Sequence, residues 1–490
     1  MMYRKSAVAL NQAFLKGEHT AVDIVSYFLQ RICRFDPDLG AFLHVLSDRV
    51  MSQARQLDLS RAHNRYLGRL AGVPIAIKDN IHVQGELTTC ASNFLSNYVA
   101  PFHATVTRLI EREGGLILGK TNLDEFAMGS STENSAYQLT KNPWNLAHAP
   151  GGSSGGSAAA TSGRLAPLSL GSDTGGSIRQ PAAFTGTVGF KPTYGRVSRF
   201  GLVAFASSLD QIGPFANGVE DIALLMEVLG HHCAYDATSL PIPPERYRDY
   251  LVNSIRGKSV GIPWKFLEGL SDTSYALFSR TLEVLKELGV KIIEVELDRL
   301  KYSLAIYYIL STAEASTNLA RFDGVRYGKR SKRAKTLDEI YNMSRGEGFG
   351  REVKRRILLG TFVLSSGYQD EYYKKAQKVR TLIIEDYKAA FAQCDLIAMP
   401  VTPSPAFKLK AIQNPIEMYL QDLYTIGANL AGLPAISLPC GQNAGGLPYA
   451  LQLVGPQLED KKVLHFAYQI EQALNLSPFV PPLLDREAGA

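Results

Sequence analysis

The sequence predicts a large α/β fold, in which a central mixed β-sheet is covered by helices on both faces. Two observations support this fold class. Short runs of aliphatic and β-branched residues alternate with segments of helical periodicity over most of the 490 residues. The composition is that of a globular protein, with 46% hydrophobic and 20% charged residues, so the chain can bury a large core without disulfides or metals.

Helical periodicity begins near the N-terminus and returns in later segments. Apolar residues recur at helical intervals from Ser6 to Phe35, and again over Ala104–Glu113 and Val219–Leu229. Between about Tyr302 and Glu385 the pattern turns helical and basic, which predicts an insertion that decorates the sheet and forms part of a substrate wall. The predicted strands are Val73–Ile77, Leu116–Leu118, Leu165–Leu170, Val188–Phe190, Ser259–Ile262, Lys291–Val295, Leu396–Met399, Ala435–Leu438 and Ala450–Val454.

Charge, cysteine usage and hydropathy restrict the class of protein. The net charge of +6 comes from 52 basic and 46 acidic residues, which permits a polyanionic partner without requiring one. The five cysteines are scattered and never occur in C-x-x-C spacing, which argues against a disulfide framework and a zinc site. Met1–Phe35 lacks the apolar core of a signal peptide, and no run of about 18 apolar residues occurs. We therefore expect a soluble, cytoplasmic protein.

Two Gly/Ser clusters, Gly151–Ser157 and Gly171–Ser177, are the compositional anomaly of the chain. A flexible linker has this composition. These clusters, however, are separated by the strand-like run Leu165–Leu170 and are followed directly by Ile178–Pro181. A linker has no reason to alternate with core elements, so we interpret the clusters as part of a site.

A serine nucleophile in these clusters requires an oxyanion site and a base. The glycines of Thr174–Ser177 allow backbone N–H groups to approach a developing oxyanion closely. No histidine lies within the segment, and His148 is the nearest on its N-terminal side. The known variant without histidine uses lysine as the base. Lys78, at the end of a predicted strand, is a candidate if its pKa falls by roughly three units from about 10.4. Without the serine clusters, a surface lysine would be the favoured interpretation of this residue.

Three motifs together resemble the amidase signature family: Gly72–Asp79, Gly151–Ala160 and Gly171–Pro181. The resemblance extends over nearly every residue of the three motifs and over their spacing. It implies a Ser-Ser-Lys catalytic group in one amidase domain over residues 1–490, with a signature core at about 70–220 and the helical substrate wall at about 300–385. The family pattern also implies a supporting role for Ser208–Pro214.

The resemblance assigns a role to each residue of the catalytic group. It implies that Ser177 is the nucleophile, that Ser153 bridges it to Lys78, and that a cis peptide bond precedes Ser153. The oxyanion hole would be formed by the backbone amides of Thr174, Gly175, Gly176 and Ser177.

Segments beyond the signature narrow the resemblance to one branch of the family. Glu314–Gly328, Gly348–Ile357, Leu364–Tyr368, Tyr372–Arg380 and Asn429–Pro434 are similar to the A subunits of tRNA-dependent amidotransferases. This implies that glutamine is hydrolysed and that its ammonia amidates a glutamyl, or in some organisms aspartyl, group on misacylated tRNA. The implied partners are a B subunit that binds tRNA and ATP with Mg²⁺, and a small C subunit. No cofactor is expected in this chain itself.

Free glutamine is a zwitterion, so a specific site needs an anion for its ammonium group and a cation for its carboxylate. By resemblance, Asp422 would be the anion and Arg356 the cation, with Tyr307 nearby. The register through the helical insertion leaves Arg355 and Tyr308 as alternatives.

Other functions remain as alternatives at this point. A stand-alone amidase for another carboxamide and a catalytically silent scaffold subunit would share these motifs. Gly114–Thr121 matches the P-loop pattern, but its centre is strand-like. Gly151–Gly155 matches the G-x-S-x-G nucleophile elbow, which would make Ser153 the nucleophile. The basic run Lys329–Lys335 is either a solvated loop or a contact for tRNA or an acidic partner.

Overall fold

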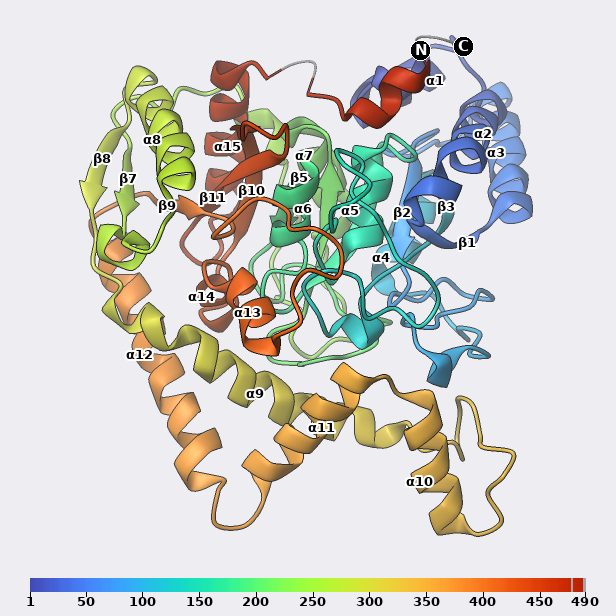
Figure 1. Ribbon diagram of the computed structural model, residues 1–490. Helices are drawn as coiled ribbons and strands as arrows, with labels where there is room; N and C mark the ends of the chain where they lie inside the picture. Colours follow the sequence, from blue (N-terminus) through green and yellow to red (C-terminus); the bar gives the residue numbers. More distant parts are fainter. Residues whose placement is uncertain (477–478, 488–490) are drawn as a thin grey trace.

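The computed structural model describes residues 1–476 and 479–487, and in this part of the chain eleven strands form one mixed sheet (Figure 1). The strands are β1 (Phe42–Val45), β2 (Pro74–Lys78), β3 (Leu116–Thr121), β4 (Leu168–Asp173), β5 (Val188–Lys191), β6 (Gln211–Ala216), β7 (Ser259–Ile262), β8 (Lys291–Glu294), β9 (Leu396–Pro400), β10 (Ala435–Gln442) and β11 (Pro448–Val454). Their order across the sheet is β1-β3-β2-β4-β6-β5-β10-β11-β9-β7-β8.

Two parallel strands in this sheet bring distant motifs to the same edge. β2 pairs in parallel with β4, with Ile77 opposite Leu170. Parallel strands end on the same side of a sheet, where ligand sites of α/β proteins collect. Lys78, the last residue of β2, therefore lies beside the end of β4 at Asp173. The turn that contains Ser177 follows β4 directly.

The helices of the described residues lie before, between and after the strands. Their bounds are α1 (Ala7–Leu15), α2 (Ala21–Leu39), α3 (Ser47–Ala62), α4 (Thr105–Arg112), α5 (Gly155–Ser162), α6 (Arg179–Thr185), α7 (Val219–Leu229), α8 (Asp272–Glu287), α9 (Ser303–Asn318), α10 (Leu337–Gly348), α11 (Arg351–Leu364), α12 (Lys375–Phe391), α13 (Pro415–Tyr419), α14 (Ile426–Leu430) and α15 (Asp460–Leu474).

Helices cover both faces of the sheet, and β6 shows how side-chain alternation produces this arrangement. Phe215 packs in a cluster with residues of α5 and α6. Ile212 and Ala216 point to the other face, where they join the main core with residues of α7 and α15. A strand buried on both sides needs apolar residues at successive positions. The predicted α/β fold class, with a mixed sheet between helical layers, is confirmed.

The nine predicted strands are all present, but two observed strands were not predicted. β6 was missed because it contains Gly213 and Pro214, which are unusual within a sheet; Pro214 pairs opposite Leu170 of β4. The short edge strand β1 was also missed. The opening helical segment divides into α1 and α2 around Gly17, whose φ of +76° favours glycine, and α2 continues beyond Phe35 to Leu39.

The segment from α9 to α12 lies along one side of the sheet body and extends away from it (Figure 1). α9 packs against α11 and α12, and α10 projects beside them. All five cysteines are free. In the described ranges, every helix is too short or too polar to act as a transmembrane span.

Candidate active site

Lys78 lies fully buried at the end of β2, surrounded by serine hydroxyl groups. Its Nζ atom lies within hydrogen-bond distance of Ser153 Oγ and Ser154 Oγ, both at 2.8 Å, and of Ser172 Oγ at 2.9 Å. A buried ammonium normally requires a carboxylate partner, yet Lys78 contacts only neutral oxygens. This environment favours the neutral amine.

The pKa of the Lys78 amine is correspondingly low. Burial lowers it to about 7, although the charges of Asp124, Asp173 and Asp210 act in the opposite direction. The value meets the requirement for a base that is partly unprotonated at neutral pH. Lys78 therefore has the electrostatic properties of a proton acceptor.

The two serines of the expected relay lie in adjoining turns. The Gly152–Ser153 peptide bond is cis, as the family resemblance implies. The amide of Ser154 donates to the carbonyl of Ser177 at 3.2 Å, which joins the two turns. Ser177 is 8% exposed whereas Ser153 and Lys78 have no exposed surface. Among the described residues, no hydrogen bond joins the Ser153 and Ser177 hydroxyl groups, so this last step of the relay stays a prediction.

The turn from Thr174 to Ser177 is held by a buried ion pair. Asp173 accepts hydrogen bonds from the Gly176 amide at 2.8 Å and from the Arg179 guanidinium at 3.0 Å. Burial alone would raise the pKa of Asp173, but the Arg179 charge and hydrogen bonds lower it to about 2. The Gly176 amide is thus occupied, whereas the amides of Thr174, Gly175 and Ser177 have no protein acceptor in the described chain. These three amides remain available to an oxyanion.

The Ser208–Pro214 segment supports this turn from the opposite side. Thr174 Oγ1 donates to Asp210 Oδ1 at 2.7 Å, and the same carboxylate accepts from the amides of Phe205 and Ala206. Asp210 therefore fixes the start of the turn, consistent with a supporting role.

Tyr307 lies directly against the same turn. A Cβ atom added to Gly175 would lie 2.6 Å from the Tyr307 ring and 2.7 Å from its hydroxyl oxygen, so glycine is required for this approach. Burial raises the pKa of Tyr307, which keeps the hydroxyl protonated as a donor. Tyr308, the alternative register, instead stacks on Tyr419 with ring centroids 3.9 Å apart.

Asp422 and Arg356 are buried charges at the same site. Asp422 is 7% exposed and accepts from Ser130 Oγ at 2.6 Å; burial raises the pKa of its carboxyl to about 7. Arg356 is 3% exposed and donates to Glu352 at 2.8 Å. The two groups are not ion-paired with each other in the described residues: Arg356 is paired with Glu352, whereas Asp422 has no ion-pair partner there. Arg355 is partly exposed and also pairs with Glu352.

Several site residues were not singled out by sequence reasoning, although they lie within the recognised motifs. Ser154 and Ser172 share Lys78 with Ser153. Gln180 accepts from the Gly152 amide at 2.9 Å and donates to the carbonyl of Ser130 at 2.9 Å, so it links the serine turns to the residue that holds Asp422. In the sequence, the only indication of a role for these residues was that they are serine and amide side chains within the motifs.

The competing motifs do not form the sites that they mimic. The centre of the P-loop-like segment is strand β3, and its Lys120 forms a fully buried ion pair with Asp79 at 2.8 Å. A P-loop requires an irregular loop at this position. For the G-x-S-x-G alternative, no histidine hydrogen-bonds to Ser153 or Ser177 within the described ranges. Those ranges also contain no cluster of three or more His, Cys, Asp or Glu arranged to hold a metal.

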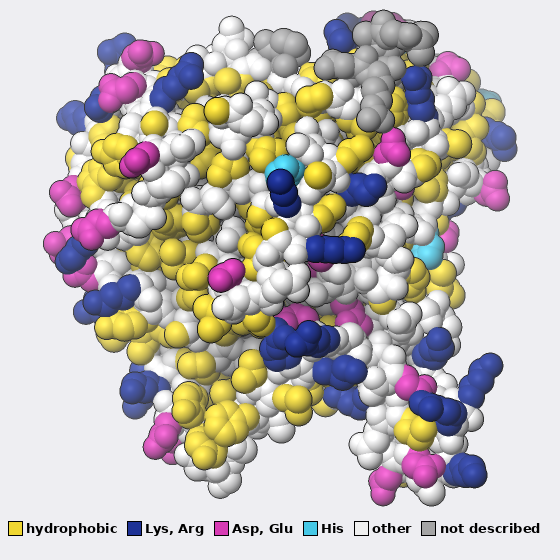
Figure 2. All heavy atoms as spheres, viewed as in Figure 1, with side chains coloured by type: hydrophobic (Ala, Val, Ile, Leu, Met, Phe, Trp, Pro, Cys, Tyr) yellow, Lys and Arg dark blue, Asp and Glu magenta, His cyan; other side chains and the backbone are white. Residues whose placement is uncertain are grey.

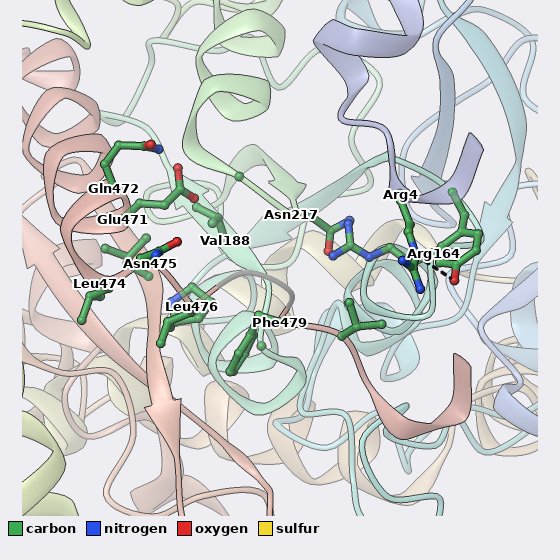
Figure 3. A pocket seen from close by; sticks show the side chains of 16 residues that line it. Arg4, Arg164, Val188, Asn217, Glu471, Gln472, Leu474, Asn475, Leu476 and Phe479 are labelled. Carbon is green, nitrogen blue, oxygen red and sulfur yellow. Dashed lines mark hydrogen bonds between the residues drawn. The ribbon is translucent and has the colours of Figure 1, made fainter. Parts of the chain in front are cut away.

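Two cavities of the protein differ in whether predicted site residues line them. A cavity of about 240 Å³ is lined by Ser131, Arg356 and Tyr419, among others, and Arg356 and its alternative Arg355 are the members of the predicted site among its lining residues. Figure 3 shows a second cavity, of about 530 Å³, between Glu471 of α15 and Arg164 after α5. None of the predicted site residues lines this second cavity.

The sheet order, the cis peptide bond and the lysine surrounded by serine hydroxyl groups define an amidase. The chain belongs to the amidase family, whose sequence model matches residues 23–464. The family resemblance inferred from the three motifs is therefore confirmed.

Individual relatives are similar over the whole length. The chain is 59% identical to the A subunit of glutamyl-tRNA(Gln) amidotransferase from Protochlamydia amoebophila, over 100% of both sequences. It is 52% identical to the protein of the same name from Chlamydia pneumoniae, over 96% of each. The crystal structure of the corresponding A subunit of glutamyl-tRNA(Gln) amidotransferase from Thermotoga maritima has a TM-score of 0.81 and 40% identity, covering 98% of this chain and 96% of that one.

Proposed function

We propose that this chain is the glutaminase subunit of a glutamyl-tRNA(Gln) amidotransferase, which hydrolyses glutamine and supplies ammonia to amidate misacylated tRNA. The observation that carries the proposal is a buried Lys78 amine within 2.8 Å of Ser153, beside a site with both a buried carboxylate and a buried guanidinium. The names of the similar proteins support the substrate assignment.

The first step is acylation of Ser177. Its oxygen attacks the side-chain amide carbon of glutamine while its proton passes through the Ser153 hydroxyl to the neutral amine of Lys78. The tetrahedral oxyanion accepts hydrogen bonds from the amides of the turn from Thr174 to Ser177, and those without a protein acceptor are the ones that donate. Ser177 is buried but, at 8%, is the member of the group with some exposed surface, which is the property expected of a nucleophile that must reach substrate.

The second step releases both products. The carbon–nitrogen bond breaks as the proton held by Lys78 returns through Ser153 to the leaving nitrogen, and ammonia departs. Water then attacks the acyl-serine by the same proton path in reverse, giving glutamate and the free Ser177 hydroxyl. The reaction needs no redox change, and the residues of this chain account for every proton transfer.

Substrate recognition follows from the charges at the site. The ammonium group of glutamine would pair with Asp422, and its carboxylate with Arg356, while Tyr307 lies against the oxyanion turn and positions the reacting amide. Burial raises the pKa of Asp422 to about 7, and a cationic ligand beside it would favour the ionised carboxylate. We prefer Arg356 to Arg355 because Arg356 is buried, and Tyr307 to Tyr308 because Tyr307 lies against Gly175 of the turn.

The proposal extends to the assembly in which this chain acts. The chain would form a single amidase domain over residues 1–490, with a signature core at about 70–220 and a helical substrate wall at about 300–385. A larger B subunit would bind tRNA, ATP and Mg²⁺, and a small C subunit would complete a heterotrimer. Because tRNA is aminoacylated in the cytoplasm, we place the complex there. No cofactor is required by this chain.

Ammonia release from glutamine by the purified full-length chain, with and without co-expressed partner subunits, tests the proposal. Ser177→Ala should abolish ammonia release, while thermal unfolding and formation of the complex remain unchanged. Ser254→Ala, at an exposed serine far from the site in sequence, is the matched control and should keep full activity. Faster hydrolysis of an aryl or acyl amide than of glutamine would contradict the substrate assignment. Retained turnover by Ser177→Ala would remove that residue from its role.

A further inference from the structure

Positive charge is concentrated in the helical segment that extends from the body. Residues 301–391 contain 18 lysines and arginines but 10 acidic residues. The net charge of this segment is therefore +8, whereas that of the whole chain is +6, so the rest of the protein is slightly acidic. Charge separated in this way creates a local positive potential even on a nearly neutral protein.

Part of this charge lies on a firmly held loop that precedes α10. The amide of Lys329 donates to the carbonyl of Phe94 at 2.7 Å, and the amide of Ser331 donates to Ser344 Oγ at 3.0 Å. The Arg330 guanidinium donates hydrogen bonds to backbone carbonyl groups at the start of the same loop. These contacts fix the backbone against both the body and α10, so the side chains project from an ordered support.

Three lysines of this loop face solvent and take part in no ion pair among the described residues. Lys329, Lys332 and Lys335 are exposed and form no ion pair within residues 1–476 and 479–487. Arg333, in contrast, pairs with Glu347. Figure 2 shows basic side chains interspersed with acidic ones at the end of the arm that α10 forms. The three lysine ammonium groups are therefore available to an external anion.

We propose that this basic loop, residues 329–335, binds the phosphate backbone of tRNA. The choice of tRNA among polyanions rests on the proposed function. Lysines are depleted in the cores of protein interfaces, where aromatic residues are enriched. The loop contains three exposed lysines and no aromatic residue. Lysine contacts to phosphate groups position a nucleic acid but do not distinguish its sequence. Such contacts fit a chain that acts beside a partner subunit which selects the tRNA.

The test compares salt-dependent tRNA binding by the full-length chain and by the triple variant Lys329→Gln, Lys332→Gln and Lys335→Gln. The probe is a fluorescently labelled tRNA(Gln) transcript, titrated at salt concentrations between about 50 and 200 mM. Each phosphate contact contributes roughly 0.9 to the slope of log affinity against log salt. Losing three contacts should reduce the slope by about 2.7. Over this salt range, the variant should therefore lose about 40-fold less affinity than the wild-type chain.

A second triple variant controls for net charge. Lys258→Gln, Lys286→Gln and Lys291→Gln remove the same charge from exposed positions around β7, β8 and α8, and should leave the slope unchanged. Equal effects of the two triple variants, or no salt-dependent binding by the wild-type chain, would overturn the proposal. Displacement of the transcript by polyglutamate as effectively as by unlabelled tRNA would assign the loop to an acidic protein instead.

Ammonia release by the same samples separates this inference from the proposed function. The loop variant should hydrolyse glutamine at the wild-type rate, because its lysines contact none of the site residues. Loss of tRNA binding with normal glutamine hydrolysis supports the loop assignment. Absence of glutamine hydrolysis in the wild-type chain and its complex would contradict the glutaminase proposal, whatever the binding result.

Discussion

The pH dependence of turnover is the most direct consequence of the environment of Lys78. Burial holds the pKa of this amine at about 7, and only the neutral form can accept the Ser177 proton. The neutral fraction is then about 9% at pH 6, about half at pH 7 and about 91% at pH 8. The lysine protonates as the pH falls, so kcat for glutamine should rise about tenfold between pH 6 and pH 8 and then level off.

Asp422 titrates over the same range but affects a different constant. Burial raises the pKa of its carboxyl to about 7, and the ionised form is the one that pairs with the glutamine ammonium group. Protonation below pH 7 should therefore raise KM rather than lower kcat. Because both groups titrate together, kcat/KM should fall more steeply than kcat on the acidic side.

The assay is initial ammonia release at saturating glutamine between pH 5.5 and 9, measured on quenched samples so that no coupling enzyme is exposed to the changing pH. Tryptophan fluorescence at each pH checks that the protein stays folded. Asp422→Asn should abolish the acidic rise in KM while retaining the pH dependence of kcat. A kcat that is constant from pH 6 to pH 8, or that rises only near the ordinary lysine pKa, would refute the assignment of Lys78 as the base.

Three further predictions follow from the site. Lys78→Arg should lower kcat by at least about 100-fold, since a guanidinium cannot act as a base; turnover near the wild-type rate would indicate a positioning role. Asp422→Asn should raise KM for glutamine by about 10- to 100-fold with a small effect on kcat, as expected for loss of one charged hydrogen bond; an unchanged KM would place the ammonium group elsewhere. Asp173→Asn should lower the free energy of unfolding in urea by about 3–5 kcal/mol, because Arg179 would remain buried without its counter-charge. The exposed control Asp370→Asn should change it by less than about 0.5 kcal/mol, and equal effects of the two would contradict the role of the buried pair.

The fold class and most strands were predictable because their sequence signals are local. Runs such as Ser259–Ile262 and Val219–Leu229 have the bounds in the structure that their patterns predict. Strand β6 was not predictable, because Pro214 is placed in the sheet by its two neighbouring strands rather than by its own propensity. Tertiary pairing overrides local preference there.

The site shows the same division between local and long-range information. The family motifs identified Lys78, Ser153 and Ser177 as candidates for one site, and the parallel pairing of β2 with β4 explains how Lys78 reaches the Gly/Ser turns. The hydrogen bonds of Ser154 and Ser172 to Lys78 depend on side-chain directions that spacing does not contain. The helical insertion carried the weakest signal, since neighbouring arginines and tyrosines at 355–356 and 307–308 differ only in which face of a helix they occupy.

The enclosure of Lys78 also determines which reagents can modify the protein. An amine that is half neutral at pH 7 would ordinarily be a strong nucleophile towards acylating and alkylating compounds. This one has no exposed surface, while Ser177 has some. Electrophiles that enter the site therefore meet the serine first, and the lysine that activates it is shielded from the same chemistry. Covalent inhibitors of this enzyme should accordingly be designed as serine acylators, with selectivity taken from the charged groups around the substrate.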